Sequence, residues 1–401
     1  MKKNKQLRIP YAMAVFGKEE IRAVNSVLKT PQIVAGKKAE EFEAKIAGLF
    51  GKKNGIFVNS GSSANLLALE ALNLPKNSEV ITPVLTFGTT VAPIVKMGLV
   101  PAFIDIDMRK FTIKEKDIEK LIGPKTKALM IPSLFGNIPD LPLIRRIAKK
   151  HDLFFIEDSC DTLGATIGGK KTGTFSDIST TSFYAAHVIT AAGEGGMICV
   201  NNDEWNQRIR MLSGWGRFSS LNETENIDKR VNKKFFGFEY DSKFTFTEIG
   251  YNLRTTDISA AFGLEQLKKL DKNSSIRRSN FLTIKKFLSD YDEFFSLPEQ
   301  RRDVETNWLA FPITIRPGAP FTRNEIVKHL EYNDIQTRPV FTGNILKQPG
   351  FKKIKHVALK EGYPNADFIM INSFVIGCHH GLHKKHLTKL FDVFEKFLST
   401  V

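Results

Sequence analysis

The sequence predicts an α/β protein, with a mainly parallel sheet covered by helices and a smaller α+β domain after it. Three observations support this class. From about residue 40 to residue 270, apolar runs of strand length alternate with helical patterns, as in sheets covered on both faces. After about residue 271 amphipathic helices dominate. The 401 residues, 42% hydrophobic, are enough for two domains, which we place at 1–270 and 271–401.

Each element follows from its own residues. Strand-like runs come, in chain order, at residues 54–60, 78–85, 100–107, 126–136, 153–160 and 195–202, with helical patterns at 63–74 and 140–152. In the second region we expect helices at 274–291, 322–333 and 384–399, and strand-like runs at 307–315 and 335–341. The segment FGKEEIRAVNSVLKT, residues 16–30, is expected to join this smaller domain.

The composition predicts neither a membrane span nor a disulfide framework. No run of about 18 apolar residues appears, and the first residues lack the apolar stretch of a signal peptide. Cys160, Cys199 and Cys378 lie far apart and form no C-x-x-C metal spacing. A reducing, cytoplasmic location is therefore expected, and no metal site.

The formal net charge of +15 has three explanations: nucleic acid, an anionic small molecule, or lysine-rich helix surfaces. The lysines are spread along the chain, many in amphipathic patterns such as SIRRSNFLTIKKFLSD. We therefore favour solvated helix faces. No zinc-finger spacing, recognition-helix signature or arginine-rich tail supports a nucleic-acid partner.

Ligands of parallel sheets bind beyond the carboxyl ends of the strands, so the segments that end strands are the places to search. NSGSSAN opens a helix whose free N–H groups suit a phosphate at Ser62 and Ser63, although a plain serine cap would look the same. In EDSCDTLGA, Asp158 and Asp161 follow a buried strand and can bind a protonated ring nitrogen or cap a turn. Phe87, in VLTFGTT, can stack on a flat ring or belong to the core.

In this order and spacing, these motifs resemble the fold-type I pyridoxal-phosphate proteins of the sugar aminotransferase and dehydratase group, the DegT/DnrJ/StrS type. The resemblance runs from YAMAVFGKEE to TRPVFTGNILKQPGF. It implies that Asp158 pairs with the pyridine nitrogen of pyridoxal 5′-phosphate and that Phe87 covers the ring. Ser182 and the backbone around Ser62 and Ser63 would hold the phosphate.

His187 ends SFYAAH, at the position where the family has the lysine that binds the cofactor covalently. Imidazole cannot form that bond, but with an ordinary pKa of ~6.5 it can carry a proton at the cofactor carbon. The resemblance is then to the sugar 3-dehydratases, which use pyridoxamine 5′-phosphate to remove the C3 hydroxyl of a nucleotide-linked 4-keto-6-deoxyhexose. Their 3,6-dideoxy-4-keto products belong to lipopolysaccharide O-antigen biosynthesis. The run from His187 to Glu194 is about one residue longer than the family pattern.

The dehydratases of this branch are of two kinds, one with an iron–sulfur cluster and one without it. One kind, resembling the CDP-4-keto-6-deoxyglucose 3-dehydratase, holds the cluster on three close cysteines after WGR and one at the position of Cys160. This chain has WGRFSSLNETENIDKRVNKKFFGF there, so we expect no cluster. The cluster-free kind, resembling the GDP-4-keto-6-deoxymannose 3-dehydratase, takes its amine from glutamate, and the chain fits that kind.

The resemblance also implies a homodimer whose neighbouring chain completes the site. Asn252, as a cofactor-binding residue, and Arg254, as a substrate-binding residue, both in GYNLR, would come from that neighbour. Arg217 and Arg338 are further candidates for the substrate diphosphate, or else form surface ion pairs. Asp161 would lie near the cofactor hydroxyl.

Three functions stay open on this basis. A sugar 3-dehydratase is favoured, because the motifs of a cofactor site accompany the histidine. A cofactor-binding pseudoenzyme, or an aminotransferase-like protein without lysine chemistry, would share His187. A nucleic-acid-binding protein would need a basic stripe that the sequence does not trace.

Overall fold

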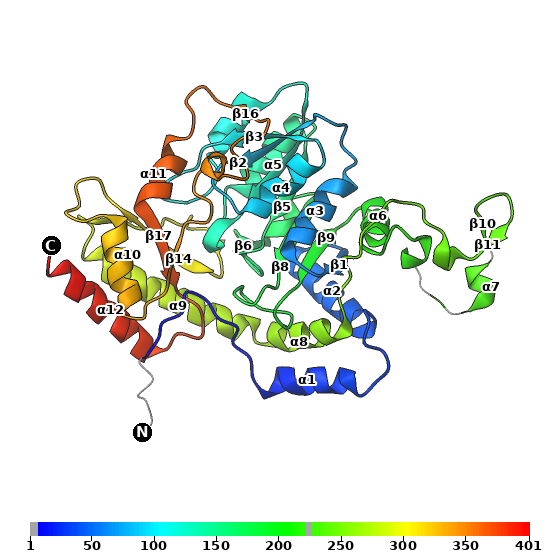
Figure 1. Ribbon diagram of the computed structural model, residues 1–401, viewed down its shortest axis with the longest axis horizontal. Helices are drawn as coiled ribbons and strands as arrows, with labels where there is room; N and C mark the ends of the chain where they lie inside the picture. Colours follow the sequence, from blue (N-terminus) through cyan, green and yellow to red (C-terminus); the bar gives the residue numbers. More distant parts are fainter. Residues whose placement is uncertain (1–6, 222–223, 225, 232) are drawn as a thin grey trace.

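A sheet of eight strands forms the centre of the computed structural model, which describes residues 7–221, 224, 226–231 and 233–401 (Figure 1). In spatial order the strands are β1 (Asn54–Val58), β9 (Gly196–Val200), β8 (Ile178–Ser182), β5 (Phe154–Asp158), β4 (Thr126–Pro132), β2 (Glu79–Pro83), β3 (Val100–Ile104) and β16 (Val357–Ala358). β9 is antiparallel to both neighbours, and the other pairings in this sheet are parallel. The predicted α/β class is confirmed.

Helices cover both faces of this sheet because the strands are apolar on both. Along β4, Ala128 and Met130 face one core, whereas Leu129 and Ile131 face the other. The first core includes residues of α3 (Gly61–Ala71), α4 (Gly88–Lys96) and α6 (Asp203–Ser213). The opposite face packs against α5 (Leu141–Lys150), α2 (Lys37–Phe50) and α8 (Asp257–Lys268).

A second, smaller sheet packs on the long helix α9 (Leu270–Ser289). Its antiparallel strands are, in order, β12 (Phe295–Ser296), β14 (Ala310–Ile315), β17 (Ser373–Gly377) and β15 (Thr337–Pro339). Helices α10 (Arg323–Tyr332) and α12 (Lys384–Leu398) close its core, and α11 (Pro364–Asn372) lies toward the large sheet. The division expected at 270/271 falls at the start of α9 and stays a prediction, since β16 returns to the edge of the large sheet.

The N-terminal helix α1 (Lys18–Leu28) packs on α8, so the expectation that residues 16–30 join the smaller domain is wrong. The reason is a buried carboxylate: Glu20 is 0% exposed and accepts from Lys269 Nζ at 2.7 Å and from Gln266 Nε2 at 2.7 Å. It is the preceding residues that reach the smaller domain. There Ile9 forms a parallel bridge with Ile335.

A projection extends away from both sheets (Figure 1, right), and its described residues are 218–221, 224, 226–231 and 233–246. We call it the arm; it carries α7 (Ile227–Arg230) and the hairpin β10 (Lys233–Lys234) and β11 (Glu239–Tyr240). Residues 222, 223, 225 and 232, part of the segment that replaces the cluster cysteines, lie outside the described residues. Within the described part of the chain, no helix combines the length and the apolar character needed to cross a bilayer.

Candidate active site

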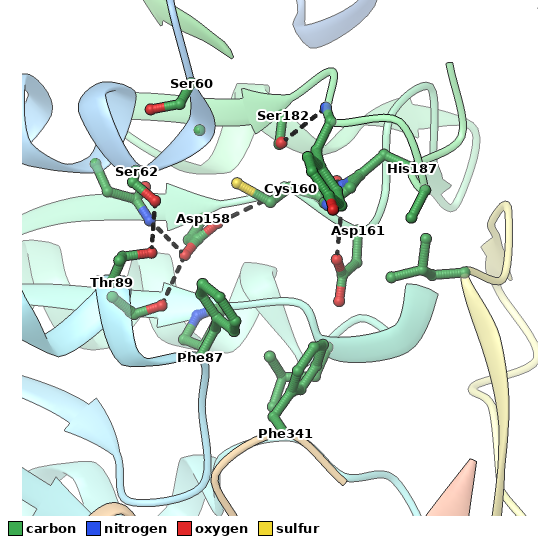
Figure 2. Close-up of a pocket in the computed structure, with 18 of the residues that line it drawn as sticks. Ser60, Ser62, Phe87, Thr89, Asp158, Cys160, Asp161, Ser182, His187 and Phe341 are labelled. Atoms are coloured by element: carbon green, nitrogen blue, oxygen red, sulfur yellow. Dashed lines mark hydrogen bonds and ion pairs between the residues drawn. The ribbon is translucent and has the colours of Figure 1, made fainter. Parts of the chain in front are cut away.

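The strand-end motifs meet at a cavity of about 450 Å³ (Figure 2). This volume lies in the range of small-molecule and cofactor sites. Of the residues predicted from the sequence, six line it: Ser62, Phe87, Asp158, Asp161, Ser182 and His187. The convergence follows from the topology, because parallel strands bring their carboxyl ends to one edge of the sheet.

Asp158 lies at the last position of β5, 5% exposed, with its carboxylate held from three sides. Oδ2 accepts from Asn65 Nδ2 of α3 at 2.8 Å and from Thr90 Oγ1 of α4 at 3.0 Å. Oδ1 accepts from the main-chain N–H of Cys160 at 3.3 Å. These bonds fix the carboxyl group of Asp158 at the floor of the cavity, where it can accept a hydrogen bond from an N–H of a ligand.

The N-terminus of α3 forms a place for an anion beside Ser182. A Cβ added to Gly61 would lie 2.7 Å from Ser182 Cβ, so only glycine allows this approach. Ser62 Oγ and Thr89 Oγ1 lie 2.9 Å apart, also on the cavity. The first N–H groups of a helix together with hydroxyls are the usual donors to a phosphate.

Ser63 is placed differently from Ser62. Its hydroxyl donates to Asn59 Oδ1 at 2.7 Å, and its main-chain N–H donates to Ser60 Oγ at 3.1 Å. Ser63 does not line the cavity, so its side chain belongs to the helix cap. At Ser63 itself, therefore, only the backbone could contribute to the anion site.

His187 lies in the tight turn that follows β8. Its main-chain N–H donates to the carbonyl of Tyr184 at 2.9 Å, and Nδ1 lies 2.7 Å from the carbonyl oxygen of Cys160. A carbonyl oxygen only accepts, so Nδ1 carries the hydrogen and Nε2 of the neutral ring is left as an acceptor. Burial lowers the pKa of the imidazole below its ordinary value, and Arg277 adds to this, whereas the carbonyl of Cys160 opposes it. The ring is therefore a neutral base near pH 7.

Asp161 faces the same ring, with Oδ1 3.9 Å from His187 Nδ1. Burial, with a smaller contribution from the Asp158 charge, raises the pKa of Asp161 to about 7, although the N–H of Phe135 donates to Oδ2 at 2.9 Å. At neutral pH this carboxyl can either donate or accept a hydrogen bond. That property suits a residue expected near a ligand hydroxyl.

An aromatic wall lies opposite the carboxylates, and the sequence analysis missed most of it. Phe341 stacks on Phe135 at 4.3 Å with 8° between the rings, and the exposed Phe87 meets Phe341 edge-on at 5.9 Å. Phe341 and Phe135 both have positive φ, +42° and +56°, which is costly for bulky side chains. Tyr11 and Leu309 also line the cavity. The TRPVF motif pointed to the segment, but no local pattern indicated the ring.

The predicted polar residues from outside the strand ends do not line the cavity of their own chain. Arg217 and Arg254 lie over the Trp215 ring, with Cζ 4.3 and 5.6 Å from its centroid. Asn252 pairs with Gly214 at the base of the arm. Arg338 Cζ lies 5.9 Å from the ring of Tyr11, a cavity residue. Their roles toward a substrate stay predictions.

Cys160 lines the cavity, with its Sγ 3.0 Å from where a Cβ on Gly61 would be. Burial raises the pKa of the thiol well above its usual range, and Asp158 adds to this. In the described residues, no three His, Cys, Asp or Glu side chains are grouped so as to hold a metal ion. The thiol is thus a neutral part of the cavity wall.

Comparisons with known proteins show which family the whole chain resembles. The family model described as the DegT/DnrJ/EryC1/StrS aminotransferase family matches residues 15–395. The chain is 37% identical to the lipopolysaccharide biosynthesis protein RfbH of Salmonella typhimurium, over 97% of this chain and 91% of that protein. It is 35% identical to the dTDP-4-dehydro-2,6-dideoxy-D-glucose 3-dehydratase of Saccharopolyspora spinosa, over 96% and 86%.

A solved structure is also similar over nearly the whole chain. It is that of the E. coli GDP-4-keto-6-deoxy-D-mannose-3-dehydratase with bound hydrated PLP. The TM-score is 0.87 at 28% sequence identity, and the match covers 97% of this chain and 99% of that one.

Proposed function

The chain belongs to the DegT/DnrJ/EryC1/StrS aminotransferase family, and from that premise we propose that it is a pyridoxamine 5′-phosphate-dependent 3-dehydratase. Its substrate is a nucleotide-linked 4-keto-6-deoxyhexose and its product a 3,6-dideoxy-4-keto sugar of the kind used in lipopolysaccharide. One observation carries the proposal: the position of the family's lysine holds His187, with Nδ1 bound to a carbonyl and Nε2 left as an acceptor.

The cavity fits the cofactor without a covalent bond. The turn at Gly61 and Ser62 would hold the phosphate, Asp158 would accept from the N–H of the protonated pyridine ring, and Phe87 would cover the ring. In its amine form the bound cofactor supplies an electron sink next to the sugar carbon that loses its hydroxyl. The held carboxylate of Asp158 keeps that ring nitrogen protonated.

His187 moves the proton. The Cys160 carbonyl holds Nδ1 as a donor, so Nε2 would be the atom that takes a proton from the amine-bearing carbon of the bound cofactor. A histidine cannot compete with the sugar for the cofactor carbon, as a lysine would.

The substrate site is completed by a second copy of the chain. The arm exposes Phe236 by 61% and Phe244 by 62%, and such an apolar surface is typical of a protein interface. Asn252 and Arg254 follow the arm in the chain, where Asn252 pairs with Gly214 and Arg254 pairs with Val58. In a homodimer these two side chains would approach the neighbour's cavity and meet the sugar diphosphate.

Absorbance spectroscopy with pyridoxal 5′-phosphate, followed by glutamate, tests the first half of the reaction. We expect the free-aldehyde band to convert to the pyridoxamine form with release of 2-oxoglutarate. His187→Asn should bind the cofactor but fail to convert it, while the exposed His356→Asn should behave as the wild type. Binding without conversion by the wild type would exclude glutamate as donor, and no binding would refute the cofactor site.

The second half is tested with 4-keto-6-deoxy sugar nucleotides of different bases. One ammonia released for each 3-deoxygenated sugar is the expected result. An aminated sugar without ammonia would identify an aminotransferase instead.

A further inference from the structure

Arg277 is a fully buried cation close to His187 and outside the cavity. It lies on α9 and is 0% exposed, so the interpretation of SIRRSNFLTIKKFLSD as a solvated face is wrong at this position. Among the described residues, no carboxylate lies within ion-pair distance of its guanidinium. The group instead donates to neutral acceptors. Nε bonds His380 Nδ1 at 3.2 Å, Nη1 bonds the carbonyls of Trp308 and Leu309 at 3.1 and 3.4 Å, and Nη2 bonds the carbonyl of His187 at 3.1 Å.

This arrangement is costly, because burying a charge without an opposite charge loses hydration that neutral acceptors only partly replace. A methionine of similar length would pack the same space more cheaply. The four acceptors come from three segments that are far apart in the sequence: the turn after β8, the chain entering β14, and the chain leaving β17. Arg277 therefore joins the turn of the large domain to the sheet of the smaller one.

We propose that Arg277 is a positioning residue for His187: by holding the His187 carbonyl it fixes the catalytic imidazole relative to the smaller domain, whose Leu309 lines the same cavity. Two contacts at the same turn, the Cys160 carbonyl on the ring and Arg277 on the main chain, leave the imidazole little freedom. The inference rests on the proposed role of His187 as the base.

The charge of Arg277 has a second effect on this turn. Burial lowers the pKa of Arg277 to about 10, so it stays protonated at neutral pH. The titratable groups that face it are Tyr11, Cys378, His379 and His380, and those that face His187 also include Asp158 and Asp161.

These neighbours do not neutralise the guanidinium near pH 7. Burial lowers the pKa of His379 to about 4 and that of His380 to about 3, and burial raises the pKa of Cys378 to about 12. The positive charge therefore favours the neutral, basic form of His187.

Arg277→Met and Arg277→Gln test the proposal in full-length protein. The first readout is the His187 pKa in the cofactor-free protein, from ring-¹³C histidine NMR with His187→Asn as the assignment. In both variants we expect this pKa to move up toward its ordinary value. Arg277→Lys keeps the charge but loses the planar fork, so the pKa should change less.

The second readout is turnover. We expect kcat to fall about tenfold in Arg277→Met, Arg277→Gln and Arg277→Lys with KM little changed, because the base is displaced while the substrate site is intact. Arg278→Met is the matched control: it is adjacent on α9, pairs with Glu305 at 2.9 Å, and should change neither readout.

The proposal would be overturned if the folded variants kept both properties of the wild type. That result would be an acid dissociation constant of His187 and a kcat that each lie within twofold of the wild-type value. If Arg277→Met fails to fold, the glutamine and lysine variants decide. The NMR readout needs no dehydratase activity, so a wrong proposed function and a wrong role for Arg277 give different results.

Discussion

The cavity and the arm differ in how well one chain provides partners for its side chains. Polar groups in the cavity have hydrogen-bond partners in the same chain, whereas large apolar side chains on the arm stay exposed. In the cavity, Asp158 is 5% exposed and held by Asn65 and Thr90, and the His187 ring is bound to a carbonyl. On the arm, Phe236, Phe238 and Phe244 leave more than half of their surface exposed. The floor of the cavity is therefore built by one chain, whereas the arm presents exposed apolar surface of the kind that is typical of protein interfaces.

His187→Asn is expected to have the largest effect. Loss of a general base costs ~10²- to 10⁴-fold in rate, so dehydration should fall by that factor while cofactor binding stays close to wild type. In the wild type, the lowered pKa of His187 places the acid limb of the kcat profile below pH 6.5, since the base is lost only when the ring protonates. An acid limb above pH 7 would contradict the environment described for this ring.

Asp158→Asn should weaken cofactor binding by about 10- to 100-fold, because a charge-assisted hydrogen bond is worth roughly 1.5–3 kcal/mol. An absorbance titration measures it. Glu157→Gln is the contrast: Glu157 is the preceding residue on β5, but it faces away and accepts from Ser176 and Ser179 at 3.2 and 3.0 Å. That variant should lose stability and keep its affinity; equal losses of affinity would mean that the two faces of β5 are not independent.

Phe236→Ser tests the arm. If a second copy covers this side chain, the dimer dissociation constant should rise by about tenfold or more, in line with the loss of an aromatic anchor. Sedimentation velocity over a concentration series measures it. Tyr332→Ser removes an aromatic that is even more exposed, at 82% on α10, and should leave the dimer unchanged. If the dimer dissociation constant is unchanged in both variants, Phe236 on the arm is not part of the dimer interface.

Asp161→Asn should raise the melting temperature of the cofactor-free protein at pH 8 by about 2 °C, with little change at pH 5. The folded protein holds the Asp161 proton up to about pH 7, whereas the unfolded chain releases it near pH 4, so wild-type stability is lost as the pH rises through that window. Melting curves at the two pH values measure the difference. A uniform shift would mean that ionisation of Asp161 costs the fold nothing.

Ala192→Gly should have the smallest effect, a gain of about 0.5–1 kcal/mol in the free energy of unfolding. Ala192 has a φ of +60°, which glycine adopts without strain. This strained residue lies in the loop that is one residue longer than expected. Ala191→Gly, at the buried neighbour, should instead destabilise, and urea unfolding compares the two.

The sequence predicted the part of the site that strand ends build. Asp158, Ser182 and Ser62 follow or open regular elements, and parallel strands bring such positions together whatever lies around them. Phe341 was not predictable in this way, because it reaches the cavity from the smaller domain on a backbone with positive φ. Arg277 lies in a helix whose charges look solvated, and only the packing of two domains on α9 buries it.

The short strand β16 has a consequence for how the protein is made. Val357 pairs with Ala102 at the open edge of β3, so the large sheet cannot be completed until nearly the whole chain has left the ribosome. At ordinary rates of synthesis this delay is on the order of tens of seconds. During that time β3 presents unpaired main-chain groups, the feature that leads nascent sheets to pair with one another. A strand that is made late thus covers the edge of a strand that is made early.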